Sequence, residues 1–144
     1  MKTSTVPVSA PTWRIVDATG MSFGRLAAQI AHVLRGKHKA SFSPHQLCGD
    51  HVIVTNVEKL GISHEKAKRK TYFDHTGYFG HETYTGLDKM MEKKPEKVIE
   101  MAVYGMLPRN RLRLQMMKRL HVFQGSEHPY APQKPEPLPM TLSI

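Results

Sequence analysis

The sequence predicts an α/β domain built around a parallel sheet. Its 144 residues suit one domain, and a chain of this length buries roughly 70% of its unfolded surface, enough for a core without disulfides. A β-branched segment, a glycine turn, an amphipathic helix and a second β-branched segment follow one another. This βαβ order favours parallel strands, because parallel neighbours need a crossover connection that is usually a helix.

The first βαβ unit can be placed residue by residue. A strand is expected at residues 13–18, a short segment with β-branched side chains that ends before Gly20. A helix is expected over residues 23–35, whose apolar side chains recur at the helical period, and Gly36 supplies its C-terminal stop. Residues 51–56 are typical of a second, largely buried strand.

The middle of the chain is expected to contribute little core. Residues 65–70 form a charge run, and residues 71–80 are expected to be an aromatic loop punctuated by glycines. A short helix follows at residues 85–92.

Two longer helices are expected next. One begins at Pro95, a residue favoured at the first helical position, and is ended by Pro108. Its apolar face consists of Val98, Ile99, Ala102, Val103 and Met106. The other spans residues 110–120 and points Leu112, Met116, Met117 and Leu120 inward. A last short strand is expected at residues 121–123.

The two ends of the chain differ from the middle. Five of the ten prolines lie from Pro129 onward, so residues 129–144 are expected to be an extended, polyproline-like tail rather than packed structure. The chain therefore divides into a flexible segment of residues 1–12, an α/β domain of residues 13–128 and this tail.

The composition excludes several classes of protein. Cys48 is the only cysteine, so no intramolecular disulfide forms and an intracellular, cytoplasmic location is expected. No segment approaches the roughly 18 apolar residues of a membrane helix, so no membrane partner is expected. Residues 1–12 lack the apolar stretch of a signal peptide.

The charge points to a polyanionic partner. The formal net charge is +9, with 21 Lys and Arg against 12 Asp and Glu. The basic residues gather, with few acids between them, near residues 35–39, 66–70 and 109–119. Such segregation favours nucleic acid, whose phosphates contact Lys and Arg, although an ordinary solvated surface is the alternative. Tyrosines beside the second group would stack on unpaired RNA bases or pack within the loop.

The sequence gives little support for other chemistry. Residues 20–24 place two glycines between strand and helix without the spacing of a dinucleotide or phosphate loop. We expect them to allow a tight turn and close packing of helix on strand, and Arg25 to assist any RNA phosphate at the helix start. His45, Cys48 and His51 form a weak zinc pattern without a second ligand pair. No metal, cofactor, small-molecule substrate or catalytic group is therefore expected, and an enzyme of nucleotide metabolism is a distant alternative.

Six motifs together resemble one known family. They are WxIVDAxGxxxGRLA from Trp13, LRGKxK from Leu34, GDxVxVxN from Gly49, HTGY from His75, AVxGMLPxN from Ala102 and GxxHP from Gly125. In this order they resemble the bacterial type of ribosomal protein thirteen of the large subunit. The chain departs from the family at Phe79-Gly80-His81, where Pro-Gly-Gly is common.

The resemblance implies both a fold and a function. The fold would be a three-layer α/β domain around a mostly parallel sheet of about four strands. The function would be that of a structural component of the large ribosomal subunit, which binds large-subunit rRNA beside neighbouring ribosomal proteins and joins early in assembly. The resemblance does not decide whether the ribosome is bacterial or organellar. A free regulator that binds mRNA is the alternative function.

Position by position, the resemblance and the charge together predict the rRNA-binding residues. They are Arg25, Arg35, Lys37, Lys39, Lys66, Lys68, Arg69, Lys70, His75, Tyr78, Arg109, Asn110, Arg111, Arg113, Lys118, Arg119, His128 and Lys134. Arg111 and Arg113 are expected to lie off the apolar face of the helix over residues 110–120.

Overall fold

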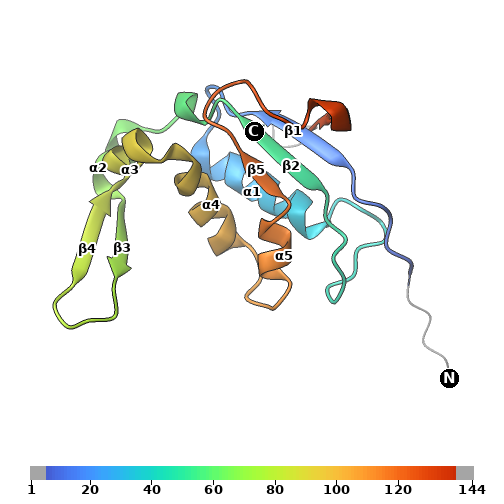
Figure 1. The fold of residues 1–144 in the computed structure, drawn as a ribbon, viewed down its shortest axis with the longest axis horizontal. Coiled ribbons are helices and arrows are strands. Elements are labelled where there is room, and N and C mark those ends of the chain that lie inside the picture. Colours follow the sequence, from blue (N-terminus) through green and yellow to red (C-terminus); the bar gives the residue numbers. More distant parts are fainter. Residues whose placement is uncertain (1–5, 139–144) are drawn as a thin grey trace.

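The computed structural model describes residues 6–138 and confirms an α/β fold with a parallel sheet (Figure 1). The sheet contains β1 (Trp13–Asp17), β2 (His51–Thr55), β5 (Leu120–Val122) and β6 (Glu136–Pro137), in the order β5-β2-β1-β6. All three neighbouring pairs are parallel. Residues 1–5 and 139–144, which belong to the expected N-terminal segment and tail, lie outside the described residues.

The first helix lies where the apolar periodicity predicts it. Helix α1 (Phe23–Arg35) connects β1 to β2 and buries one face. Gly36 ends the helix with a φ of 83°, a left-handed conformation that glycine adopts without strain. Its N–H donates to the carbonyl of Val33 at 2.9 Å, which satisfies one of the last helical acceptors. The predicted strand, helix and strand are therefore confirmed to within one residue.

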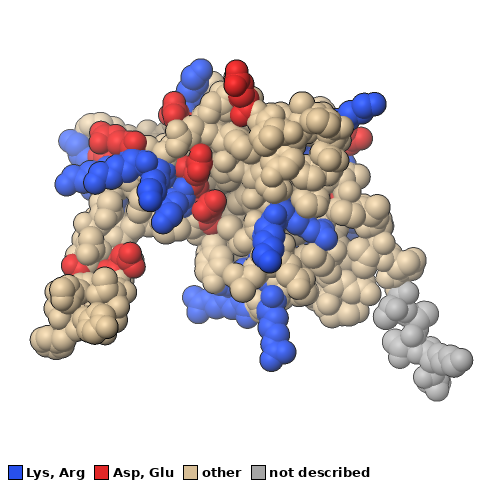
Figure 2. Space-filling model, in the orientation of Figure 1, with Lys and Arg blue, Asp and Glu red and all other residues tan. Residues whose placement is uncertain are grey.

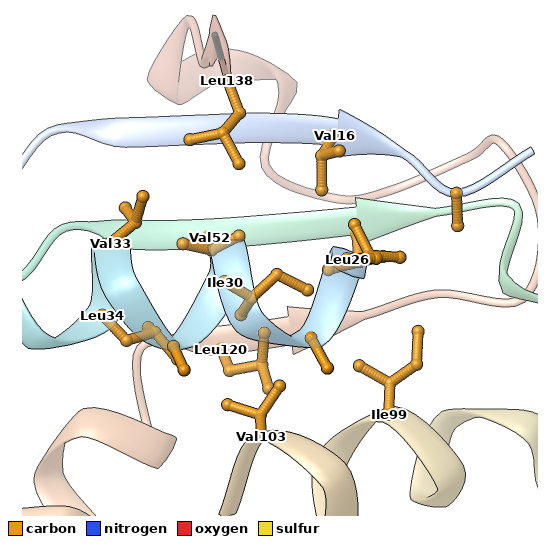
Figure 3. Close-up of a cluster of buried hydrophobic side chains, with 14 of the residues drawn as sticks. Val16, Leu26, Ile30, Val33, Leu34, Val52, Ile99, Val103, Leu120 and Leu138 are labelled. Atoms are coloured by element: carbon orange, nitrogen blue, oxygen red, sulfur yellow. The ribbon is translucent and has the colours of Figure 1, made fainter. Parts of the chain in front are cut away.

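The main core lies between the sheet and three helices on one of its faces. Helix α1 packs against the strands, and α4 (Pro95–Met106) and α5 (Arg113–Met117) pack against α1. Figure 3 shows side chains of the sheet, α1 and α4 meeting in one cluster, which includes Val52, Ile30 and Val103. Full burial of each such side chain stabilises the fold by about 1.5–3 kcal/mol.

The opposite face of the sheet carries a row of stacked rings. Strand alternation places Trp13, His51 and His121 on this face, and the Trp13 and His51 ring centroids lie 4.2 Å apart. The ring centroid of Tyr130 lies 4.4 Å from that of His121. Tyr130 directly precedes a 3₁₀ turn, η2 (Ala131–Gln133). Burial lowers the pKa of both histidines, and the nearby charge of Arg119 lowers that of His51 further. Both rings are therefore stabilised in their neutral form.

Part of the proline-rich tail joins the sheet, so the expectation that it stays unpacked is wrong for these residues. Glu136 and Pro137 pair with β1, and the N–H of Leu138 donates to the carbonyl of Ile15 at 2.8 Å. The side chain of Leu138 is buried in the main core. An edge strand tolerates Pro137 because only one side of the strand needs donors.

The loop predicted over residues 71–80 is wrong for residues 71–75, which form a strand of a hairpin, and is confirmed for residues 76–80, which connect its two strands. Strands β3 (Thr71–His75) and β4 (Glu82–Gly86) pair antiparallel and project from the body of the molecule (Figure 1). Threonine and aromatic residues favour strands, and Gly77 and Gly80 take positive φ values of 90° and 79° in the connection. Helix α2 (His64–Arg69) precedes the hairpin and α3 (Leu87–Lys93) follows it, two residues later than predicted.

The remaining helices are shorter or less buried than expected. The helix predicted over residues 110–120 contains only α5, because residues 110–112 form turns and Leu120 begins β5. Met106, predicted to point inward, is 48% exposed at the end of α4. A 3₁₀ turn, η1 (Val57–Lys59), follows β2. None of the helices in residues 6–138 is long and apolar enough to cross a membrane.

The close approach of helix and strand depends on a glycine that the sequence analysis did not select. A Cβ on Gly49 would lie 1.8 Å from the carbonyl oxygen of Leu34 in α1. A Cβ on Gly24, by contrast, would meet no atom within 4 Å. The expectation that Gly24 permits close packing is therefore wrong, and Gly49 has that role.

We expect Gly49→Ala to lower the free energy of unfolding by about 1–3 kcal/mol, because the added methyl group overpacks a closed contact. Urea unfolding followed by circular dichroism measures the change. Gly24→Ala is the matched control and should leave stability unchanged or slightly higher. Equal stability of the two variants would contradict this account of Gly49.

We also expect stability to fall as the pH is lowered from 7.5 to 5. His51 and His121 have pKa values below the unfolded value of about 6.5, so the unfolded chain binds more protons in this range. The contribution of these two histidines to stability is present above pH 6.5 and is lost as the pH falls toward their pKa values in the folded protein. Urea unfolding of His121→Phe, which keeps a ring in the stack, should show a smaller pH dependence. An unchanged dependence would contradict the prediction.

Candidate nucleic-acid interface

The first basic group is organised by a fully buried carboxylate. Asp50, directly before β2, has an exposed fraction of 0%. Lys39 Nζ donates to its Oδ1 at 2.5 Å, the backbone N–H of Thr12 donates to the same oxygen at 3.0 Å, and His38 Nε2 lies 2.8 Å from Oδ2. Burial alone would raise the pKa of Asp50, but these hydrogen bonds outweigh it and hold the pKa below its usual value. Asp50 therefore stays charged inside the fold.

This arrangement divides the basic residues at the end of α1. The Lys39 side chain is only 15% exposed and is bonded to Asp50, so the prediction of Lys39 as an RNA contact loses its physical basis. Lys37 is exposed. Arg35 is half-buried, with its guanidinium 5.6 Å from the centre of the Phe42 ring. Lys37 and Arg35 remain the cations of this group that can meet a partner.

The second basic group lies on α2. Lys66, Lys68 and Arg69 are exposed. Lys70 instead turns toward the body, with its ammonium 4.8 Å from the centre of the Phe23 ring and 5.1 Å from that of Tyr72. Burial lowers the pKa of Lys70. Lys70 therefore fastens the base of the hairpin to the start of α1 by cation–π contacts.

A hollow of about 550 Å³ lies between α2 and the start of α1. Its walls include Ser22 and Gly24 at the first turn of α1, and Lys66, Arg69 and Lys70. The first turn of α1 carries no acid, and no side chain caps it. The hollow therefore places two ammonium groups and a guanidinium group beside the first turn of α1, whose dipole favours anions, together with the one carboxylate of Glu65. Exposed Arg25 follows directly on α1.

The third basic group also divides into outward and inward members. Arg109, Arg111 and Lys118 are exposed, as is Asn110. Arg113 is only 9% exposed, and its guanidinium donates to the carbonyls of Pro108 at 2.9 Å and Leu107 at 3.1 Å. The prediction that Arg113 lies off the packed face is therefore wrong, because Arg113 satisfies the carbonyls that follow α4.

Arg119 closes a contact between two strands of the sheet. Its guanidinium donates to the carbonyl of Gly49, directly before β2. Burial is the main cause of the lowered pKa of Arg119. Arg119 is thus half-buried and holds the start of β5 against the start of β2.

The last predicted residues lie apart from these groups. His75 and Tyr78 are exposed on the hairpin, which contains no Lys or Arg. His128 is half-buried, with its ring 6.2 Å from that of Phe123, and Lys134 is exposed beside η2. Figure 2 shows blue side chains at the α2 end of the molecule, mixed with red, and below α4 and α5, where red is absent in this view.

The side chains of the weak zinc pattern do not form a common site within the described residues. Cys48 Sγ is buried near the carbonyl of Ser41, at 3.7 Å, while His51 stacks on Trp13 across the sheet. Asp50 is bonded to Lys39 and His38. Within residues 6–138, no three His, Cys, Asp or Glu side chains gather in a way that could hold a metal ion.

The roles of Asp50 as the organising residue and of Arg14 as its neighbour were not predicted from the sequence. Arg14 Nε lies 4.0 Å from Asp50, and its Nη1 lies 2.6 Å from Glu136 of β6. The signal that could have found them was an acid directly before a buried strand, since an acid in that position needs a partner. Exposed lysines on α3 and α4 were also left out: Lys89, Lys93 and Lys97.

The fold and these groups define a class: a small basic α/β protein whose cations partly stabilise the fold and partly form grouped, exposed patches. The family model described as ribosomal protein L13 matches residues 11–129. The chain belongs to this family of structural ribosomal proteins.

Relatives at about half identity cover most of the chain, and three of them, each named large ribosomal subunit protein uL13, illustrate the similarity. The relative from Symbiobacterium thermophilum is 50% identical over 126 residues, which cover 88% of each chain. That from Gemmatimonas aurantiaca is 51% identical over 127 residues, 88% of this chain and 85% of the relative. That from Chlorobium phaeobacteroides strain BS1 is 53% identical over 123 residues, 85% and 82% respectively.

We expect Asp50→Asn to lower the free energy of unfolding by about 3–5 kcal/mol, because it leaves Lys39 and Arg14 without their buried counter-charge. Asp17→Asn is the control. Asp17 is an exposed carboxylate bonded to Thr19 and Asn56, and its replacement should cost much less. Urea unfolding at pH 7 compares the two. A loss of stability at Asp50 no larger than that at Asp17 would show that the buried charge does not organise the fold.

Proposed function

We propose that this protein is a structural component of the large ribosomal subunit that binds large-subunit rRNA and acts early in subunit assembly. Family membership and the names of the relatives support the ribosomal part of the proposal. The observation that supports RNA binding is the division of the cations, because those not engaged by the fold lie exposed in groups.

The proposed interface has three parts. The first is the hollow beside Lys66 and Arg69, with Lys68 and Arg25 next to it. The second is the end of α1, with Arg35 and Lys37. The third is the exposed set after α4, which comprises Arg109, Asn110, Arg111 and Lys118. Lys134 and His128 extend the surface toward the C-terminal segment.

The chemistry of these parts favours recognition of backbone and shape. Exposed ammonium and guanidinium groups contact phosphates and release counterions, so affinity depends strongly on salt. The inward cations Lys39, Lys70, Arg113 and Arg119 act instead as positioning residues that fix the segments carrying the outward ones.

Early binding requires a protein that is folded before its neighbours arrive. The main core and the ion pairs around Asp50 are internal to the chain, which supports that role. A bacterial-type cytoplasmic ribosome is the proposed location. Crosslinking followed by RNA sequencing separates this proposal from the mRNA alternative, since rRNA should dominate the reads.

Neutralising the α2 group should weaken retention on large subunits. We expect the variant Lys66→Gln, Lys68→Gln, Arg69→Gln to dissociate at lower salt than the unchanged chain. The slope of log affinity against log salt should become shallower by up to about 3, roughly one for each phosphate that the variant no longer neutralises. Sedimentation of reconstituted large subunits at graded salt measures both.

A charge-matched variant controls for net charge. Lys89→Gln, Lys93→Gln, Lys97→Gln removes the same charge from α3 and α4, where exposed acids such as Glu92 and Glu100 lie among the lysines. This variant should behave nearly as the unchanged chain does. If both variants weaken retention equally, net charge rather than the α2 surface governs binding.

A further inference from the structure

The β3–β4 hairpin presents an exposed aromatic surface with no partner within the described chain. Its register pairs Phe73 with Tyr84, and their ring centroids lie 5.3 Å apart. Their exposed fractions are 58% and 65%, Tyr78 is 75% exposed, and Phe79 at the tip is fully exposed. Several large exposed aromatic side chains on one short hairpin favour an interaction site.

The charge of the hairpin is opposite to that of the rest of the protein. None of the 21 Lys and Arg residues lies between Thr71 and Gly86, whereas Asp74 and Glu82 do, both exposed. Figure 2 shows tan and red atoms over the hairpin and no blue ones. Single-stranded RNA surfaces combine aromatic rings with a basic groove that follows the phosphates. This hairpin has the rings but carries acids where the groove needs cations, so RNA phosphates would be repelled.

The hairpin also lacks the support that a stable two-stranded sheet needs. Tyr72 packs against Lys70 at its base, and β4 contacts α2 and α3, while the tip projects away from the body of the molecule (Figure 1). An isolated hairpin is marginally stable in water. Within residues 6–138, no further strand pairs with the outer edges of β3 and β4, and a partner that covers the rings would add the missing support.

The tip contains a recess suited to a cationic side chain. A hollow of about 610 Å³ is lined by His75, Gly77, Phe79, Gly80 and Glu82. A Lys or Arg of a partner entering it would meet the Glu82 carboxylate and the face of the Phe79 ring together, which is ion pairing combined with a cation–π contact.

From these observations we infer that the hairpin is a docking surface for a basic protein and not for RNA. The inference rests on the proposed function for its setting, because the partner is a neighbouring protein of the same particle. It assigns Phe73, Tyr78, Phe79 and Tyr84 to apolar contact with that protein. Glu82, which the register places on the same face as Phe73 and Tyr84, is assigned to its Lys and Arg residues. His75 and Tyr78, expected from the sequence to bind rRNA, move to the protein interface.

Site-specific photo-crosslinking in assembled large subunits tests the inference. A benzophenone amino acid replaces Phe79 in one full-length variant and Lys68 in another. We expect the group at position 79 to crosslink to a protein segment rich in Lys and Arg, identified by mass spectrometry, and the group at position 68 to crosslink to rRNA. A crosslink from position 79 to RNA, to a second copy of this chain, to a segment without basic residues or to nothing overturns the inference. Absence of an rRNA crosslink at position 68 counts against the proposed function instead.

A charge reversal provides a second measurement that does not depend on the probe. Glu82→Lys, added to the variant with the probe at position 79, should reduce the protein crosslink about fivefold, since the ion pair with the partner becomes a repulsion. Glu92→Lys, at an exposed position on α3, is the matched control and should leave the yield unchanged. Circular dichroism confirms that each variant is folded. An unchanged yield, or a gain in crosslinking to RNA, overturns the inference.

Discussion

The carboxylate of Asp50 joins segments that lie far apart in the sequence. It accepts hydrogen bonds from Thr12 before β1 and from Lys39 after α1, and it lies itself at the start of β2. Arg14 extends the network to Glu136 of β6. A buried carboxylate without such partners would be strongly unfavourable, so the segments must meet in this arrangement or the charge must be neutralised. The position of the basic end of α1 relative to the sheet follows from this one group.

The protein uses its positive charge in two ways. Lys70 lies against aromatic rings, and Arg113 and Arg119 donate to backbone carbonyls, so these cations stabilise the fold. Neighbouring cations such as Lys68 and Arg111 face solvent and are available to phosphates. In each basic group, cations that stabilise the fold and cations that face solvent lie within a few residues of one another. An outward cation is therefore held in place by an inward one from the same segment, which limits the conformational freedom that RNA binding would otherwise remove.

The period of apolar residues predicts a helix or strand when that element buries one face and the pattern lies within one short segment of the sequence. Helix α1 and the β1 and β2 strands were predicted closely because their apolar residues recur at the right period. The hairpin was missed because most of its aromatic residues are exposed and it shows no clear alternation of buried and exposed side chains. Strand β6 was missed because its pairing with β1 joins residues far apart in sequence and involves a proline. The basic groups were found from composition, but whether Arg113 points in or out depends on the carbonyls left free after α4, which only the fold reveals.

The strand order has a consequence for synthesis of the chain. The two inner strands, β1 and β2, come from the first 55 residues, while both outer strands, β5 and β6, come from residue 120 onward. A nascent chain therefore carries β1 and β2 without their outer neighbours until residues 120–137 have left the exit tunnel of the ribosome that makes it. Open edges promote aggregation, so the interval before release is the vulnerable period in the life of this protein. Once β6 has paired with β1, the edge on that side is a two-residue strand whose Pro137 has no backbone N–H, which is poorly suited to pairing with another chain.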